Sequence, residues 1–175
     1  MKLDATPLGK PLYAKLGFVD EYEIELWILK RPPAVSRTAR STCPRLVPVQ
    51  LEQIFQFDSE LFGADRSFLL RSLHDQNPEF AVAVYENGLP QGYAFGRRGL
   101  FADHLGPWKL LQVFLAQSLR ETLIVDCLKS NPVSVELLRA CGFVPSRPLT
   151  RMVRGPNDYL GRPDSFCAIL GPEFG

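Results

Sequence analysis

Residues that build metal centres are scarce in this sequence. The 175 residues include four cysteines and two histidines, and no CxxC pair occurs. Because a structural zinc site needs about four well-spaced cysteine or histidine ligands, the sequence predicts no metal centre.

An excess of charge of either sign is also lacking. The chain has 20 basic and 19 acidic residues, whereas proteins that bind nucleic acids or anionic membranes concentrate positive charge. No apolar run approaches the ~18 residues of a membrane-spanning helix, and the N-terminus MKLDATPLGK has no apolar signal-peptide core. We therefore expect a soluble, cytoplasmic protein that binds neither nucleic acid nor membrane.

Apolar residues make up 46% of the chain, enough for a packed core, and the sequence divides into three segments. Residues 1–29 end in the alternating run EYEIELWIL, which predicts a strand with one apolar face. Residues 30–44, KRPPAVSRTARSTCP, are rich in proline, arginine, serine and threonine and predict a linker. Residues 45–175 have the length of a whole domain.

The third segment alternates helical and extended patterns. Apolar spacing predicts helices over 51–62, 66–76, 107–121 and 132–141, the last with Asn131 as its N-cap. Apolar runs predict strands over 80–85, 89–96, 122–128, 148–154 and 165–170, and Asn87-Gly88 predicts a tight hairpin. Because hairpins pair antiparallel and strand-helix-strand units pair parallel, we expect an α/β (α+β) fold with a mixed sheet.

One sequence motif occurs twice in the chain. Each copy predicts a strand, a turn with proline, a helix and then Gly-Phe; the two copies are LDATPLGKPLYAKLGF and VDCLKSNPVSVELLRACGF. When Gly17 is aligned with Gly142, Tyr13 falls on Leu138. This repeat favours a tandem array of one fold.

Besides the two repeated motifs, four others occur in the order DSELFGADRSFLLRSL, HLGP, TRMVRGPN and ILGPEFG. Through these motifs the chain resembles the GNAT superfamily of acyl-CoA-dependent N-acyltransferases. They resemble in particular a subset with two GNAT domains in tandem. The resemblance implies a GNAT fold, with a mixed, mostly antiparallel sheet whose splayed central strands are flanked by helices. It also implies that residues 1–29 end a first domain, that residues 45–175 form a divergent second one, and that acetyl-CoA donates an acetyl group to a small-molecule amine.

Acyl transfer from a thioester to an amine needs a cradle for the CoA pyrophosphate, a base for the ammonium, and a hydrogen-bond donor for the leaving thiolate. GNAT enzymes resemble one another in supplying the cradle as Q/R-x-x-G-x-G/A and the donor as a tyrosine. The junction FADHLGPWKLLQ lacks that cradle, and Leu138 stands at the tyrosine position. In the first segment Tyr13 occupies this position, either as the donor or as a residue without a catalytic role.

The resemblance implies further candidates in the second segment. His104, Leu105 and Gly106 lie where a GNAT fold splays two strands to admit the pantetheine arm, and His104 is a candidate base or a structural residue. Asn131 matches an asparagine that many GNAT domains use near CoA, although helix capping explains it as well.

Asp65 and Arg66 form an acidic-basic pair beside a glycine turn. Such a pair can bind a polar substrate. The alternative is that the segment only ends one helix and that the aspartate caps the next.

Three functions remain open at this point. The chain is an N-acetyltransferase that binds acetyl-CoA without the standard cradle, a non-catalytic ligand-binding domain with a GNAT fold, or an assembly module. In the last case the N-terminal strand-helix-strand packs on the domain's own sheet or swaps into a second copy to give a homodimer.

Overall fold

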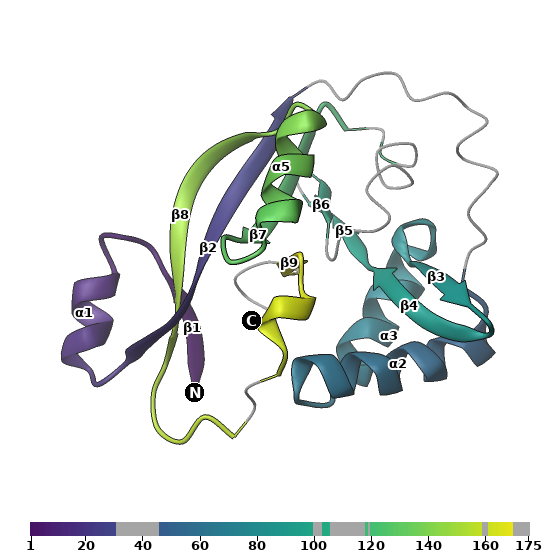
Figure 1. Ribbon diagram of the computed structural model, residues 1–175, viewed down its shortest axis with the longest axis horizontal. Helices are drawn as coiled ribbons and strands as arrows, with labels where there is room; N and C mark the ends of the chain where they lie inside the picture. The colour runs from purple at the N-terminus through teal and green to yellow at the C-terminus, as the bar shows by residue number, and fades with distance from the viewer. Residues whose placement is uncertain (31–45, 100–102, 106–117, 119, 159–160, 170–175) are drawn as a thin grey trace.

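The computed structural model describes residues 1–30, 46–99, 103–105, 118, 120–158 and 161–169, and a seven-stranded sheet forms its centre (Figure 1). The strand order is β1-β8-β2-β7-β6-β5, and β9 pairs with β7 beside β6. The bounds are β1 Lys2–Ala5, β2 Val19–Lys30, β5 Gly96–Arg98, β6 Asp103–Leu105, β7 Thr122–Leu128, β8 Val144–Val153 and β9 Ala168–Ile169. Only β6 and β7 pair parallel among the described strands, which confirms the predicted fold class.

The helices agree with the predicted periodicity where the structure describes them. They are α1 Lys10–Lys15, α2 Pro48–Phe62, α3 Ser67–Gln76 and α5 Pro132–Ala140, with short 3-10 turns η2 Pro78–Phe80 and η3 Pro163–Ser165. The predicted hairpin is β3 Val82–Glu86 and β4 Leu89–Ala94, whose turn residues Asn87 and Gly88 both have positive φ. Most of the helix predicted over 107–121 lies outside the described residues.

The repeated phrase corresponds to two β-α-β units, β1-α1-β2 and β7-α5-β8, related by a pseudo-two-fold axis. β2 and β8 pair with each other, and the first strand of each unit pairs with the last strand of the other. After each helix, the N–H of Phe18 donates to the carbonyl of Tyr13 at 3.1 Å, and the N–H of Phe143 donates to that of Leu138 at 3.0 Å. The sequence repeat is therefore also a structural repeat.

The N-terminal segment is an integral part of this sheet, with β1 at its edge and β2 inside it. β2 lies between β7 and β8, so residues 1–30 and 120–158 share one set of backbone hydrogen bonds. The predicted division at 1–29, 30–44 and 45–175 stays a prediction, because residues 31–45 lie outside the described part of the chain.

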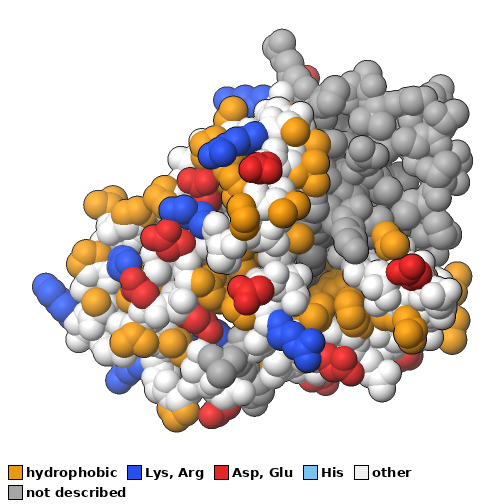
Figure 2. Space-filling model, in the orientation of Figure 1, with side chains coloured by type: hydrophobic (Ala, Val, Ile, Leu, Met, Phe, Trp, Pro, Cys, Tyr) orange, Lys and Arg blue, Asp and Glu red, His pale blue; other side chains and the backbone are white. Residues whose placement is uncertain are grey.

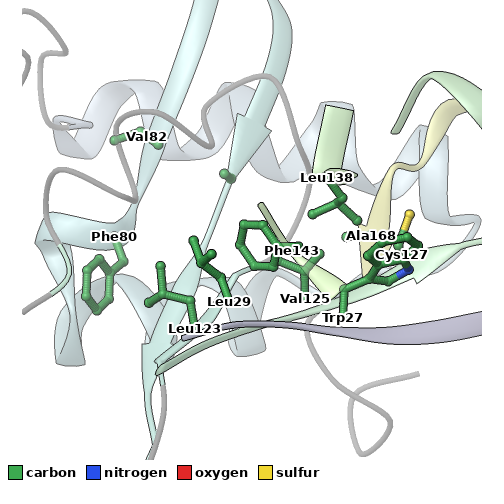
Figure 3. Close-up of a cluster of buried hydrophobic side chains, with 11 residues drawn as sticks. Trp27, Leu29, Phe80, Val82, Leu123, Val125, Cys127, Leu138, Phe143 and Ala168 are labelled. Atoms are coloured by element: carbon green, nitrogen blue, oxygen red, sulfur yellow. The ribbon is translucent and has the colours of Figure 1, made fainter. Parts of the chain in front are cut away.

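β2 buries both of its faces, so the prediction of a single apolar face was wrong. On one side Trp27 and Leu29 pack with Val125, Leu138 and other members of a core cluster (Figure 3). On the other side Ile24 packs against Leu128, Leu149 and Phe166. The cause is tertiary, since α5 covers one face of this strand and the C-terminal segment covers the other.

A second core holds the remaining elements together. α2, α3 and the β3–β4 hairpin bury a cluster around Ile54, Leu70 and Phe95 (Figure 1). Within the described residues, no helix is long and apolar enough to cross a membrane. The same residues contain no group of three or more His, Cys, Asp or Glu side chains that could hold a metal ion.

Candidate functional site

A small cavity lies between α2, α3, the hairpin, β2 and the C-terminal segment. Its volume is about 20 Å³, enough for roughly one water molecule. Four aromatic side chains and two residues of β9 line it together with one charged group, Arg66; the aromatic residues are Tyr22, Phe62, Tyr93 and Phe166. A guanidinium among aromatic walls is held in a site of low polarity, where its electrostatic interactions are strong.

Asp58 fixes the position of Arg66. Nε of Arg66 donates to Oδ2 of Asp58 at 3.1 Å, and Nη2 donates to Oδ1 of the same carboxylate. The hydroxyl of Tyr93 also donates to Oδ1, and Asp58 is fully buried. Burial, followed by the charge of Asp58, raises the pKa of Tyr93, so this hydroxyl remains a donor. The Arg66 guanidinium stacks over the Phe62 ring at 3.7 Å, which fixes its plane.

The local sequence explains this network. Asp58 follows Leu51, Ile54 and Phe55 on the buried face of α2, where a carboxylate needs a charged partner. Arg66 stands at the N-cap of α3 and reaches back over the intervening turn to this carboxylate. Asp65, in contrast, is exposed and accepts a hydrogen bond from the N–H of Ser67 at 2.8 Å, which lowers its pKa. The two residues of the predicted pair therefore differ in position: Arg66 lines the cavity, and Asp65 is exposed and binds the first N–H of α3.

A second buried ion pair lies next to the cavity. Arg151 of β8 and Asp4 of β1 are register partners, and both side chains are almost completely buried. Nη2 of Arg151 donates to Oδ2 of Asp4 at 2.9 Å, and Nε donates to Oδ1. The guanidinium lies 5.4 Å from the ring centre of Tyr22, whose pKa burial raises. Tyr22 thus lies between the Arg151 pair and the cavity that Arg66 lines.

Sequence reasoning missed this arrangement. Asp4 and Arg151 are 147 positions apart, so no local pattern links them. The available signal was an arginine within the apolar strand PLTRMVR, where a buried charge requires a partner.

The outer edge of β7 is the place where the resemblance implies that the pantetheine arm enters. β6 pairs with Leu123 to Val125, and β9 pairs with Asp126 and Cys127. The N–H of Leu128 then donates to the carbonyl of Cys167 at 3.3 Å. This edge of β7 is therefore occupied by the chain's own strands from Leu123 to Leu128.

Asn131 holds the same C-terminal segment in place. Its Oδ1 accepts from the N–H of Ser134 at 3.1 Å, which confirms the predicted N-cap, and its Nδ2 donates to the carbonyl of Phe166 at 3.4 Å. His104 and Leu105 form part of β6, where His104 is the register partner of Arg97 and Ile124. Gly106 lies outside the described residues. The roles predicted for these residues toward CoA stay predictions.

Close packing on α2 also holds this segment. The N–H of Arg162 donates to the carbonyl of Leu61 at 2.6 Å, and a Cβ on Gly161 would lie 2.5 Å from the carbonyl oxygen of Phe62. The rings of Phe62 and Phe166 pack edge to face with centroids 6.1 Å apart. The segment from Gly161 to Ile169 is thus tied to both α2 and β7.

Tyr13 is not among the residues that line the cavity. It is half-buried on α1, its ring packs 5.8 Å from that of Phe18, and it covers a small cluster with Ala5 and Met152. Its hydroxyl has no hydrogen-bond partner in the described part of the chain. Four large apolar side chains close to it in sequence are exposed, namely Leu8, Leu12, Leu16 and Val19. Figure 2 shows hydrophobic surface at the end of the molecule where α1 lies.

Comparison with known proteins gives a family match and a shared fold. A family model for the acetyltransferase (GNAT) domain matches residues 54–165. Among solved structures, a protein of Pyrococcus horikoshii assigned as an acetyltransferase is similar over 99% of this chain and 59% of its own, with 21% identity and a TM-score of 0.71. A search of the curated proteins finds no match.

Two further structures extend the comparison. A GCN5-related N-acetyltransferase of Sphaerobacter thermophilus covers 86% of this chain at 17% identity, with a TM-score of 0.58. An acetyltransferase from the GNAT family of Colwellia psychrerythraea covers 86% at 12% identity, with a TM-score of 0.54. The chain spans less than two thirds of each of these proteins, 59%, 58% and 63% of their lengths.

Proposed function

Because this chain belongs to the family of GNAT acetyltransferase domains, we propose that it acts in transfer of an acetyl group from acetyl-CoA to a small-molecule amine. We further propose that the thioester end of the donor binds beside β1 and Tyr13, in the first β-α-β unit. The second unit, β7-α5-β8, then has a structural role in this reaction.

The observation that carries this proposal is the difference between the two units at equivalent places. In the second unit, Leu138 stands at the tyrosine position, is fully buried and has no proton to donate. The outer edge of β7 is also filled by β6 and β9. In the first unit, Tyr13 is half-exposed, and no strand among the described residues pairs with the outer edge of β1.

The residues present fit acetyl-CoA differently in the two units. The edge of β7 does not accept an extended ligand while β9 is bound there, so we derive no step at that edge. At β1, backbone N–H and C=O groups on the open edge would pair with the amides of the pantetheine arm. Acetyl-CoA would supply an activated acetyl group: as the amine nitrogen forms a C–N bond to the acetyl carbon, the C–S bond would break. The nitrogen would release a proton to solvent, and the CoA thiolate would take one up. The hydroxyl of Tyr13 would donate a hydrogen bond to the departing sulfur.

Thiol release from acetyl-CoA, measured with a panel of amines, tests the proposal. We expect Tyr13→Phe to lower kcat by about 100-fold, with KM for acetyl-CoA nearly unchanged. Tyr85→Phe is the matched control, because among the described residues its hydroxyl donates a hydrogen bond to the carbonyl of Gln50 at 3.4 Å, away from Tyr13.

The His104→Ala variant tests the alternative location of the thioester, between β6 and β7. If this substitution abolishes turnover while Tyr13→Phe leaves it intact, the thioester binds between β6 and β7 and the proposal is wrong. That result would also support the predicted roles of Leu105, Gly106 and Asn131 toward CoA.

The exposed end of the sheet favours a second candidate function, a non-catalytic assembly module. Two β1 edges can pair antiparallel about a two-fold axis, which would make a homodimer through the N-terminal segment and cover Leu12 and its apolar neighbours. This function predicts no acetyl-CoA binding by calorimetry and a dimer by light scattering. Leu12→Lys should then give a monomer, whereas Leu137→Lys, at the equivalent position of α5, should leave the dimer intact.

A further inference from the structure

We propose that an open groove between α2 and β4 binds a small organic cation, a primary amine with an apolar chain. The inference goes beyond acetyl transfer, because Tyr13 does not line this groove and the binding needs no acetyl-CoA. The groove has a volume of about 380 Å³, within the range of about 300–1,000 Å³ that is typical of small-molecule sites. A ligand of several carbon atoms therefore has room in it.

One wall of the groove is a stripe of side chains on α2. They are spaced i, i+3, i+4 and i+7, so they share one face of the helix; they are Gln53, Gln56, Phe57 and Glu60. Because seven residues of an α-helix rise about 10.5 Å, this wall is long enough for an extended chain. The half-buried ring of Phe57 is fixed by the ring of Tyr93, which packs edge to face with it at 6.1 Å.

The opposite wall is an irregular stretch of β4. Leu89, Pro90 and Gln91 all line the groove, although successive residues of a regular strand point to opposite faces. The pairing of β3 with β4 skips Gln91, which has no register partner in β3. An extra residue of this kind forms a β-bulge, which changes the direction of side chains. The bulge explains why three consecutive residues of β4 contribute to one groove.

Glu60 gives the groove a negative charge that no residue of its lining offsets. The other lining residues are three glutamines and three apolar residues, and none of them is basic. In the described part of the chain, the carboxylate of Glu60 forms no ion pair, whereas that of Glu52 on the same helix binds Arg71 at 2.5 Å. A carboxylate without a counter-charge favours a cation in the groove and disfavours an anion.

The glutamines add acceptors for an ammonium group, which has three N–H donors and accepts no hydrogen bond. Each glutamine has a carbonyl oxygen that accepts hydrogen bonds, and no hydrogen bond joins the three lining side chains to another described residue; they are Gln53, Gln56 and Gln91. The apolar lining residues would contact the carbon chain of the ligand. Leu89, which is 64% exposed, would then be covered.

A nitrogen-15 NMR titration of the whole chain tests the proposal with hexylamine, hexan-1-ol and hexanoate, which share one carbon chain and differ in charge. We expect hexylamine to cause saturable shifts in the backbone signals of α2 and β4. Hexan-1-ol should bind about fivefold more weakly, and hexanoate should not bind. Glu60→Gln should weaken hexylamine binding by about fivefold, the upper end for an ion pair in contact with solvent.

Two matched pairs of variants separate the groove from the rest of the helix. Glu52→Gln should bind hexylamine as the wild type does, because Glu52 does not line the groove. Leu89→Lys adds a positive charge to the wall and should abolish the binding, whereas Val49→Lys, at a 73% exposed position of α2 outside the groove, should not. Equal binding of the three probes, absence of saturable shifts in α2 and β4, or equal loss within either pair of variants would each overturn the proposal.

Discussion

The two β-α-β units share a backbone arrangement but differ in what their helices cover. α5 buries Ser134 and Leu138 against the core that contains Trp27, whereas α1 buries none of its residues completely. The helix-to-strand turns are alike, since Gly17 and Gly142 both have a φ of 85°. The comparison shows that the local sequence sets the turn, while the neighbouring elements decide whether the helix becomes part of a core.

The outer edges of the two units differ in the same way. The edge of β7 binds β6 and β9, and the edge of β1 pairs with no strand in the described ranges. An open strand edge can pair with another polypeptide or with an extended ligand, whereas an occupied edge cannot. For this reason we assign the proposed donor site to the first unit.

The largest expected effect concerns the ion pair that ties the first unit to the second. Asp4→Asn would leave the buried guanidinium of Arg151 without its counter-charge and should lower the free energy of unfolding by about 3–5 kcal/mol. Urea denaturation measures this change. As a control, Asp20→Asn should cost less than about 1 kcal/mol, because the Lys10–Asp20 pair is largely exposed to solvent. Equal costs would mean that the buried pair does not hold the units together.

The second largest expected effect concerns the different burial of α5 and α1. Leu138→Ala should lower the free energy of unfolding by about 2–5 kcal/mol, because it opens a cavity in a closed core. Leu12→Ala on α1 should change it by less than about 0.5 kcal/mol, because this side chain is 59% exposed. A cost for Leu12→Ala as large as that for Leu138→Ala would show that α1 is covered in solution, for example by a second copy.

The smallest effect tests the likeness of the two turns. Gly17→Ala and Gly142→Ala should each cost about 1–2 kcal/mol, because both positions have the left-handed backbone conformation that a Cβ disfavours. The nearest atom to an added Cβ is 3.8 Å away at Gly17 and 3.6 Å at Gly142, so steric contact adds little at either position. Thermal and urea unfolding of both variants should give matching values, and a clear difference would argue against the structural repeat.

Much of the fold could be predicted from local patterns. Period-3.6 spacing located α2, α3 and α5, Asn87-Gly88 located the hairpin, and Asn131 was recognised as an N-cap. The repeat around Gly17 and Gly142 was visible because it depends on short-range chemistry. For Asp65 and Arg66, the sequence identified the place but not which residue faces the cavity, since that depends on where α2 puts Asp58.

Two features of the sheet could not be predicted in this way. β9 and β6 share one edge of β7, an arrangement that depends on pairing between segments far apart in the chain. β2 buries two faces although its alternating sequence is typical of a strand that buries one. In both cases the missing information was which element covers the strand.

The sequence by itself determined the short-range features: turns, caps, helical faces and the repeated β-α-β pattern. Only the tertiary structure decided that Asp4 binds Arg151, that Asp58 and Tyr93 fix Arg66, and that β9 fills the edge of β7. The physical reason is the range of the interactions. Backbone conformation is set by neighbouring residues, whereas buried ion pairs and strand pairing join residues that meet only when the chain has folded.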